Sequence, residues 1–253
     1  MPTSEEIAQL QAQLAQRERQ LAELAPAYED FLRAVSHDLR APLRHITSYG
    51  SLLREVLQEA SLPASAQEEA DEFLATMQQS AQRMGHMLDG LLALSRIVRA
   101  PLQLQPVPLA ELLSQVQSEL AGRIGQRAIL WQVDIQPQPV QADAALLRQL
   151  LWQLLDNALK FTQSCAQAEI RVACWQQADG QILLRVQDNG VGFNPARAAG
   201  LFGLFQRLHR EGEFDGVGAG LAAVRAIAQR HGGEVQASAQ PGQGCMVTVA
   251  WPG

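Results

Sequence analysis

Cysteine is scarce in this chain, and its spacing indicates neither metal nor disulfide chemistry. The 253 residues include three cysteines, Cys165, Cys174 and Cys245, without a Cys-x-x-Cys pair. An odd number of cysteines without ligand spacing excludes a disulfide framework and a zinc ribbon. This usage fits a reducing compartment, so we expect the chain to be cytoplasmic.

Long apolar runs are also absent from the sequence. No segment approaches the roughly 18–20 apolar residues that are needed to cross a bilayer. The first ten residues contain Glu5 and Glu6 and no hydrophobic stretch, which is unlike a signal peptide. We therefore expect neither a membrane span nor a secretion signal in this chain.

Basic charge and aromatic side chains are in short supply. Twenty Lys and Arg stand against 26 Asp and Glu, and the resulting formal charge of −6 disfavours a protein that coats nucleic acid. Aromatic residues make up 5% and hydrophobic residues 47%, so the cores must consist mainly of Leu, Ala, Val and Ile. This apolar content excludes wholesale disorder, and the length suits two domains.

The opening of the chain has the spacing of a coiled coil, which we assign to residues 1–26 and which continues to Val35. Apolar residues recur at steps of three and four, with one charged interruption at Arg17: Ile7, Leu10, Leu14, Leu21, Leu24, Tyr28, Phe31 and Val35. So narrow a seam needs a partner helix, which predicts a dimer, with a local bend at Pro26. The alternative is a long amphipathic helix that packs on its own chain.

Residues 27–100 are expected to form a helical hairpin. The helical pattern is broken near Ser61–Gln67, which contains Pro63, and resumes over Gln67–Arg99. One face of the second helix carries Phe73, Met77, Met84, Met87, Leu88, Leu91 and Leu94. One hairpin cannot bury its apolar faces, so we expect two chains to form a four-helix bundle as a dimerisation domain.

Three prolines in residues 101–108 predict a hinge linker before a second domain at 109–253. We expect an α/β sandwich there, one sheet covered on one face by helices. Helices are predicted over Leu109–Leu120, Asp143–Phe161 (with Asp143 as cap) and Ala219–His231. Strands are predicted over Ala128–Ile135, Glu169–Trp175, Gln181–Gln187, Glu234–Ser238 and Cys245–Trp251.

His37 lies on the outward face of the first long helix. At 100° per residue it falls roughly 170° from the centre of the apolar arc. A neutral imidazole can act as a nucleophile near pH 7, and the adjacent Asp38 could orient its ring. Taken alone, this pattern favours an ordinary surface histidine followed by a solvated carboxylate.

Two segments of the second half predict contacts with a nucleotide. At helical spacing Asn157 and Lys160 share a face, where an amide oxygen could bind Mg²⁺ and an ammonium could bind phosphate. Asp188 follows a strand and could accept a hydrogen bond from an exocyclic amine, with Gly190 and Gly192 allowing close approach of a ring. The alternatives are a helix with a polar outer face and a hairpin turn.

Two further segments complete this pattern. Residues 202–209 could form a small movable lid, or else an ordinary amphipathic helix. Gly216, Gly218 and Gly220 precede a helix, where free N–H groups could cradle an anion, although a flexible loop is the alternative. The spacing does not match a Rossmann fingerprint, and a polar loop rather than a strand comes before it.

The run from Phe31 to Leu43, with Ser36-His37-Asp38 and Pro42, resembles the H box of sensor histidine kinases. The resemblance implies a phosphoacceptor role for His37, an assisting acid in Asp38 and a helix-bending role for Pro42. Residues 82–96 and 202–216 resemble the phytochrome-type subgroup.

The four nucleotide segments, in their order, resemble the N, G1, F and G2 boxes of the ATP-binding domain shared by histidine kinases, gyrase, large heat-shock chaperones and mismatch-repair ATPases. The resemblance implies that Asn157 holds Mg²⁺ and that Lys160 and Arg207 contact phosphates. It also implies that Phe161 packs on adenine and that Asp188 reads its amine.

Two positions depart from the family pattern in ways that bear on activity. Gln153 occupies a catalytic position where kinases usually carry Asn and the related ATPases carry Glu, and it cannot act as a base. We expect activity to survive, because phosphoryl transfer depends mostly on positioning and charge stabilisation. Ala41 cannot position a water, which predicts weak phosphatase activity.

These observations predict an ATP- and Mg²⁺-dependent autokinase that phosphorylates His37 and passes the group to an aspartate of a response regulator. We expect a homodimer that receives its signal from an upstream sensor domain or a separate sensor protein. A non-catalytic nucleotide-binding scaffold and a general ATPase of the same fold are the alternatives.

Overall fold

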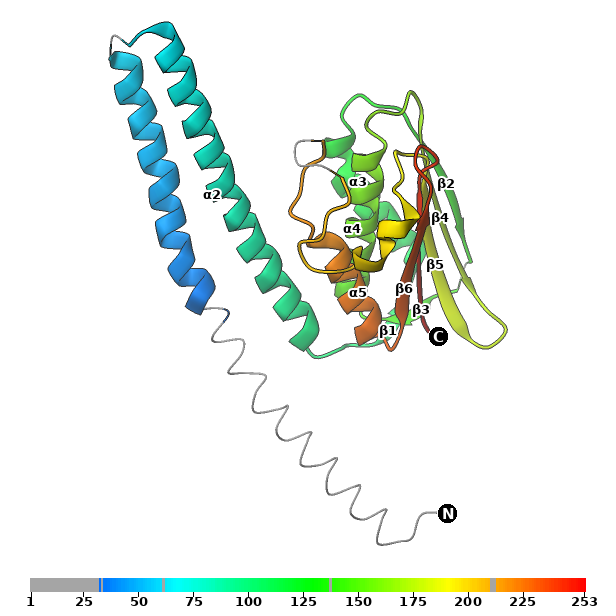
Figure 1. Ribbon diagram of the computed structural model, residues 1–253. Helices are drawn as coiled ribbons and strands as arrows, with labels where there is room; N and C mark the ends of the chain where they lie inside the picture. Colours follow the sequence, from blue (N-terminus) through cyan, green and yellow to red (C-terminus); the bar gives the residue numbers. More distant parts are fainter. Residues whose placement is uncertain (1–31, 33, 61, 137, 210–212) are drawn as a thin grey trace, which may run out of the picture. The chain divides into compact units, whose positions relative to one another are not determined.

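The structure is a computed structural model that describes residues 32, 34–60, 62–136, 138–209 and 213–253 (Figure 1). The coiled coil predicted over residues 1–26 lies outside this range. Contacts divide the chain into two units, Met1–Leu92 and Ala93–Gly253, and each is described by itself. Among the described helices, none combines the length and the apolar character needed to cross a membrane.

The first unit is the helical hairpin expected from the sequence. A first helix covers residues 34–59, and α2 covers Ala64–Arg99. Helix α2 begins three residues before the predicted start because the carbonyl of Pro63 accepts hydrogen bonds from Ala66 N and Gln67 N. Proline suits this boundary, since it lacks the N–H that a first helical turn would leave unpaired.

The two hairpin helices contact each other through small and polar side chains. Leu74 and Ala81 of α2 are buried, and Gly50 is buried on the first helix. A β-carbon on Gly50 would come within 3.1 Å of the Met77 side chain, so glycine permits the close approach. The side chain of Gln78 donates to Ser51 Oγ over 3.1 Å, which adds a polar tie.

This contact leaves much of the hairpin's apolar surface exposed. The exposed large side chains come from both helices: Leu39, Tyr49, Leu52, Leu53, Val56, Phe73, Met77 and Met84. An exposed apolar surface of this extent on one hairpin is expected to pack against another protein surface.

The second unit is the predicted sandwich. Its sheet has the strand order β2 (Ile129–Ile135), β4 (Ala168–Gln176), β5 (Gln181–Asp188), β7 (Cys245–Pro252) and β6 (Glu234–Ala239). Helices α3 (Leu109–Ile124), α4 (Ala144–Phe161) and α5 (Gly220–Arg230) cover one face (Figure 1). Only the β2–β4 pair is parallel; the other pairs of this sheet are antiparallel.

Alternating side chains of the strands and the inner faces of the helices form one aliphatic core. Every second residue of β5 is buried, and β4 follows the same alternation over most of its length. The largest fully buried side chains are Leu109, Leu113, Leu120, Leu150, Leu151, Leu155, Ile170, Leu184 and Ile227. The core thus consists of the residue types expected where aromatic residues are few.

Capping residues set the ends of the helices that carry the site. Asp143 Oδ1 accepts from Ala145 N and Leu146 N and begins α4, as the sequence predicts. Gly232 adopts φ 73°, a conformation that favours glycine, directly after the helical cap of α5. These residues therefore set where α4 begins and where α5 ends.

Three short elements were not predicted. Strands β1 (Gln105–Val107) and β3 (Val140–Ala142) pair as a small antiparallel sheet, and a 3-10 helix, η1, covers Pro195–Gly200. Strand β1 lies inside the segment 101–108 that the sequence predicts as a hinge linker. Three-residue strands give no usable alternation, and prolines at positions 106 and 108 disfavour a strand locally.

Candidate active site

His37 projects from the first helix into solvent. Its side chain is 86% exposed, whereas the preceding Ser36 is 1% exposed. The two neighbouring residues therefore lie on different faces of the helix, one in solvent and one buried. The Nδ1 atom lies 3.2 Å from Asp38 Oδ1. A carboxylate partner requires the proton on Nδ1, which leaves the lone pair of Nε2 directed at solvent.

An ion pair joins the histidine-bearing helix to α2. The guanidinium of Arg40 donates to Asp89 Oδ1 over 2.6 Å, and both side chains are at least half exposed. Arg40 is one helical turn beyond His37, so this pair holds the turn that presents the imidazole. No spacing rule links positions 49 residues apart, and sequence reasoning missed this contact.

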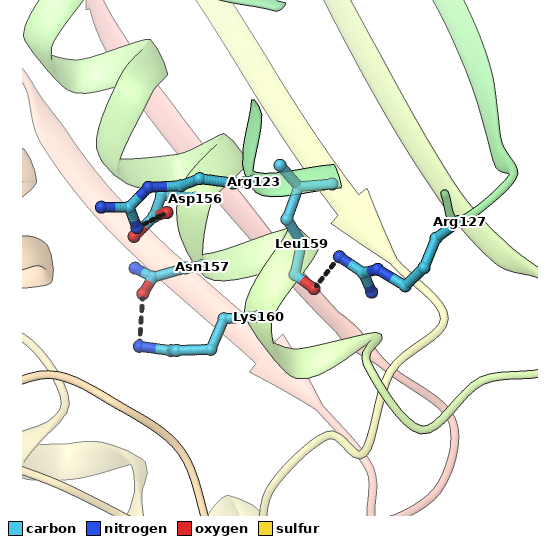
Figure 2. A network of polar contacts seen from close by, with 6 residues as sticks. All are labelled: Arg123, Arg127, Asp156, Asn157, Leu159 and Lys160. Carbon is cyan, nitrogen blue, oxygen red and sulfur yellow. Dashed lines mark hydrogen bonds and ion pairs between the residues drawn. The ribbon is translucent and has the colours of Figure 1, made fainter. Parts of the chain in front are cut away.

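The last turns of α4 carry the amide predicted to hold Mg²⁺ and the ammonium predicted to contact phosphate. Lys160 Nζ donates to Asn157 Oδ1 over 3.1 Å, and Figure 2 shows both side chains on one side of the helix. Burial lowers the pKa of Lys160. Among its charged neighbours, Asp156 and Asp215 raise this pKa whereas Arg207 and Arg123 lower it, so acidic and basic groups from separate elements lie close to Lys160.

An ion pair between Arg123 and Asp156 lies beside this turn, as Figure 2 shows. Arg123, in the last turn of α3, donates to Asp156 Oδ1 over 2.5 Å, and its guanidinium carbon lies 5.0 Å from the centroid of the Trp152 ring. Arg127 Nη2 donates to the carbonyl of Leu159 over 3.2 Å. These contacts fasten the end of α3 and the following turn to the part of α4 that carries the site.

Phe161 belongs to a cluster of three aromatic rings. Its centroid lies 5.2 Å from that of His209 and 4.9 Å from that of Phe214, and Lys160 Nζ lies 4.5 Å above its ring. Arg207 Nη2 donates to the carbonyl of Phe214 over 2.7 Å. His209 and Phe214 were not among the predicted site residues, although His209 is the last residue of the predicted lid and Phe214 follows it closely in the sequence.

The glycine segment before α5 lies directly on α4. A β-carbon on Gly220 would come within 2.5 Å of Gln153 Oε1, and one on Gly216 would lie 3.7 Å from Lys160 Nζ. Gly218 adopts φ 76°, and its carbonyl accepts from Phe205 N. The predicted glycines therefore stand over the face of α4 that carries Gln153, Asn157 and Lys160.

Asp188 is buried at the end of β5. Its Oδ1 accepts from Gly190 N over 2.8 Å and from Cys245 N over 3.3 Å. Burial raises the pKa of Asp188 to about 6, and the two backbone hydrogen bonds limit that rise. A buried carboxylate with both of these bonds on one oxygen has its second oxygen left to recognise a ligand donor.

Close backbone contacts attach the Asp188 turn to the end of α4. A β-carbon on Gly190 would lie 2.3 Å from the carbonyl oxygen of Phe161, which also accepts from Val191 N over 3.2 Å. Gly192 adopts φ 60°, and a β-carbon there would lie 2.0 Å from Gln240 O. Both glycines are thus required sterically at this junction.

The structure therefore gathers most of the predicted residues in the second unit. Contacts connect Gln153, Asn157, Lys160, Phe161, Asp188, Gly190, Gly192, Arg207, Gly216, Gly218 and Gly220 around the C-terminal half of α4. His37 and Asp38 belong to the first unit. The second unit thus carries the group of residues predicted to bind a nucleotide, and the first unit carries an exposed imidazole.

The two units match two family models in the same order. Residues 27–99 match the His Kinase A (phospho-acceptor) domain, and residues 142–253 match the histidine kinase-, DNA gyrase B- and HSP90-like ATPase. Together the matches cover well over half of the chain. The chain belongs to the histidine kinases, with a phospho-acceptor domain followed by an ATP-binding ATPase domain.

Curated relatives support the same family. The methanogenesis regulatory histidine kinase FilI of Methanothrix harundinacea is 30% identical over 96% of this chain and 26% of its own length. Cyanobacterial phytochrome A of Nostoc sp. is 31% identical over 95% of this chain and 30% of its own length. The chain thus spans about a quarter to a third of these relatives.

Among solved structures, full-length ShkA in complex with AMPPNP is similar to this chain. The two share 27% sequence identity with a TM-score of 0.62, over 88% of this chain and 45% of ShkA. The hairpin followed by the sandwich is therefore a combination of folds already seen in a solved structure.

Proposed function

We propose that the chain transfers the γ-phosphoryl group of ATP to His37 and then to an aspartate of a response-regulator receiver domain. The observation that carries this proposal is the pairing of an exposed imidazole, oriented by Asp38, with an ATPase domain on the same chain. Nε2 attacks the γ-phosphorus, a P–N bond forms, and the bond to the β,γ-bridging oxygen breaks to release ADP. Asp38 stabilises the proton that remains on Nδ1.

The second half of the reaction restores the imidazole. A carboxylate oxygen of the receiver aspartate attacks the same phosphorus, the P–N bond breaks, and its electron pair returns to Nε2. The exposure of His37 supports this step, because a receiver domain must reach the nitrogen without rearrangement of the hairpin.

The ATP site is assigned to the residues gathered around α4. Asp188 accepts from the exocyclic amine of adenine, and Lys160 and Arg207 bind phosphate oxygens. The glycines at 216, 218 and 220 admit the phosphates close to backbone N–H groups. Gln153, beside Gly220, contributes an amide rather than a base, which suits a transfer that depends on positioning.

Mg²⁺ is assigned to Asn157. Among the described residues no group of three or more His, Cys, Asp or Glu could hold a metal ion, so the protein offers no cage of its own. An amide oxygen fits Mg²⁺, which prefers hard oxygen ligands and keeps waters and nucleotide phosphates as its other ligands. When bound, the ion neutralises charge on the phosphates; Lys160 must then release Asn157 Oδ1.

We further propose four segments of the chain and a subgroup. Residues 1–26 form a coiled-coil signalling helix and 27–100 the dimerisation and phosphotransfer domain. Residues 101–108 form the linker, which is bonded to the ATPase domain through β1, and 109–253 form that domain itself. Motif resemblance favours the phytochrome-type subgroup, although FilI and phytochrome A show nearly equal identity to this chain. An upstream sensor domain or a separate sensor protein supplies the signal.

The exposed apolar face of the hairpin supports a homodimer. We expect Phe73→Glu, at a side chain 64% exposed in one chain, to shift the protein from dimer to monomer in analytical ultracentrifugation. The reason is that a buried unpaired charge costs several kcal/mol at an interface. Val133→Glu, at a residue 50% exposed on β2, is the matched control. A Phe73→Glu protein as dimeric as the control would contradict this arrangement.

Labelling with γ-³²P-ATP tests the proposed function. Wild type should acquire acid-labile label, His37→Ala should acquire none, and His45→Ala, at an exposed histidine on the same helix, should behave as wild type. ATP turnover that persists in His37→Ala identifies a general ATPase. Intact ATP binding without any label identifies a non-catalytic scaffold, and either result overturns the proposal.

A further inference from the structure

The last turn of α2 is part of the second unit's core. Ile97 is 3% exposed within the core cluster of the ATPase domain, and Leu94 and Leu102 pack against that cluster. The contact-based division of the chain falls accordingly between Leu92 and Ala93, inside α2 rather than after it. The helix thus enters the ATPase domain before it ends.

Arg230 binds two carbonyl groups at the C-terminal end of α2, one in its last turn and one in the residue directly after it. Its Nη1 donates to the carbonyl of Val98 and its Nη2 to that of Ala100. Terminal helix carbonyls lack intrahelical partners and carry partial negative charge, so a guanidinium there satisfies and neutralises two of them at once. Both hydrogen bonds come from one planar guanidinium group, in the last turn of α5.

The neighbouring His231 and Asp143 hold the next residues. His231 Nδ1 lies 2.8 Å from the carbonyl of Ile227, so it carries the proton, and Nε2 accepts from Asp143 N over 3.0 Å. Asp143 Oδ2 in turn accepts from Gln103 N over 3.0 Å while Oδ1 caps α4. The connecting chain is therefore bonded to the start of α4 as well as to the end of α5.

Strand pairing fixes the remainder of the connection. Gln105, Pro106 and Val107 pair with Ala142, Gln141 and Val140, and Val107 is 3% exposed. Between residue 97 and residue 107 the chain is thus held at most positions by burial, side-chain hydrogen bonds or strand pairing. Such a segment is a poor hinge, despite its prolines.

We propose that Arg230 is a positioning residue for phosphoryl transfer. It makes residues 97–107 a fixed part of the ATPase domain. The joint about which this domain moves toward the phosphoacceptor histidine then lies within α2, before Ala93. Gly90 lies just before that point, and glycine weakens a helix interior relative to alanine. This inference rests on the proposed function for its kinetic consequence but not for its structural one.

Hydrogen exchange and kinetics on the full chain test the proposal together. Arg230→Met should raise amide exchange over residues 98–107 by about tenfold, because two charged hydrogen bonds are lost. It should also lower the kcat for His37 labelling about three- to tenfold with the KM for ATP unchanged, since a looser connection reduces productive encounters. Arg230→Lys, which can satisfy one carbonyl, should be intermediate.

Arg225→Met, at an exposed arginine on the same helix, is the matched control and should resemble wild type in both assays. Unchanged exchange in Arg230→Met overturns the proposal, as does a defect confined to KM. A fluorescence melt first confirms that Arg230→Met is folded; if it is not, Arg230→Lys is judged by the same two criteria. If wild type acquires no label on His37, the proposed function fails, and the exchange comparison still decides whether the segment is fixed.

Discussion

Asp188→Asn is expected to weaken ATP binding about 100-fold and, at the same time, to stabilise the ATPase domain. The amide oxygen of the substituted side chain would keep the bonds from Gly190 N and Cys245 N. Its NH₂ group would then face the exocyclic amine of adenine, donor against donor, at a cost of about 2–3 kcal/mol. Calorimetric titration with ATP at pH 7.5 measures this loss.

The gain in stability follows from the raised pKa of Asp188. Because the folded state binds the proton more tightly than the unfolded chain, the carboxylate destabilises the fold as pH rises from about 4 through about 6. Above that range the penalty is complete, at about 3 kcal/mol as an upper value. Asp188→Asn removes it, so the mutant should gain stability at pH 7.5 and little at pH 4.

Urea unfolding followed by tryptophan fluorescence measures this gain selectively. All four tryptophans, Trp131, Trp152, Trp175 and Trp251, lie in the second unit. Asp134→Asn, at an exposed position on β2, is the control and should change neither property. A destabilised Asp188→Asn protein, or one that binds ATP normally, would contradict the role assigned to this carboxylate.

The second large effect is expected at Gly190. A β-carbon there would lie 2.3 Å from the carbonyl oxygen of Phe161, and this neighbour is backbone that cannot swing aside. Gly190→Ala must therefore push the Asp188 turn away from α4 and break the bond from Val191 N to Phe161 O. We expect a loss of about 2–4 kcal/mol of stability and of detectable ATP binding.

Gly122→Ala is the matched control. Gly122 lies within α3, where an added β-carbon meets nothing within 4 Å. The same substitution there should leave ATP binding intact and raise stability by about 0.5–1 kcal/mol, since alanine favours the helix. Equal behaviour of the two alanine variants in urea unfolding and ATP titration would refute the steric account of Gly190.

Local signals account for the parts of the fold that the sequence predicts. Asp143 caps α4, the Ala178-Asp179-Gly180 turn joins β4 to β5, and 3.6-residue periodicity marks the hairpin helices. Each of these features depends on residues within a few positions of one another, so it is visible without knowledge of the tertiary structure.

Contacts between distant positions explain what the sequence does not predict. Strand β1 exists because β3 pairs with it, and the ion pair of Arg123 with Asp156 joins two helices. Arg230 contacts Val98 of α2 across 132 residues of sequence. At the nucleotide site the N and G1 boxes point to Asn157, Lys160 and Asp188. The packing of His209 and Phe214 on Phe161 joins residues about 50 positions apart, so no local motif predicts it.

The position of the phosphoryl group on the histidine tests the central claim most directly. Wild-type chain is incubated with ATP and Mg²⁺, digested at alkaline pH, and its phosphopeptide is examined by tandem mass spectrometry and ³¹P NMR. We expect one phosphohistidine at residue 37, bonded through Nε2, because Asp38 holds the proton on Nδ1. Phosphate on another residue, or on Nδ1 of His37, would contradict it.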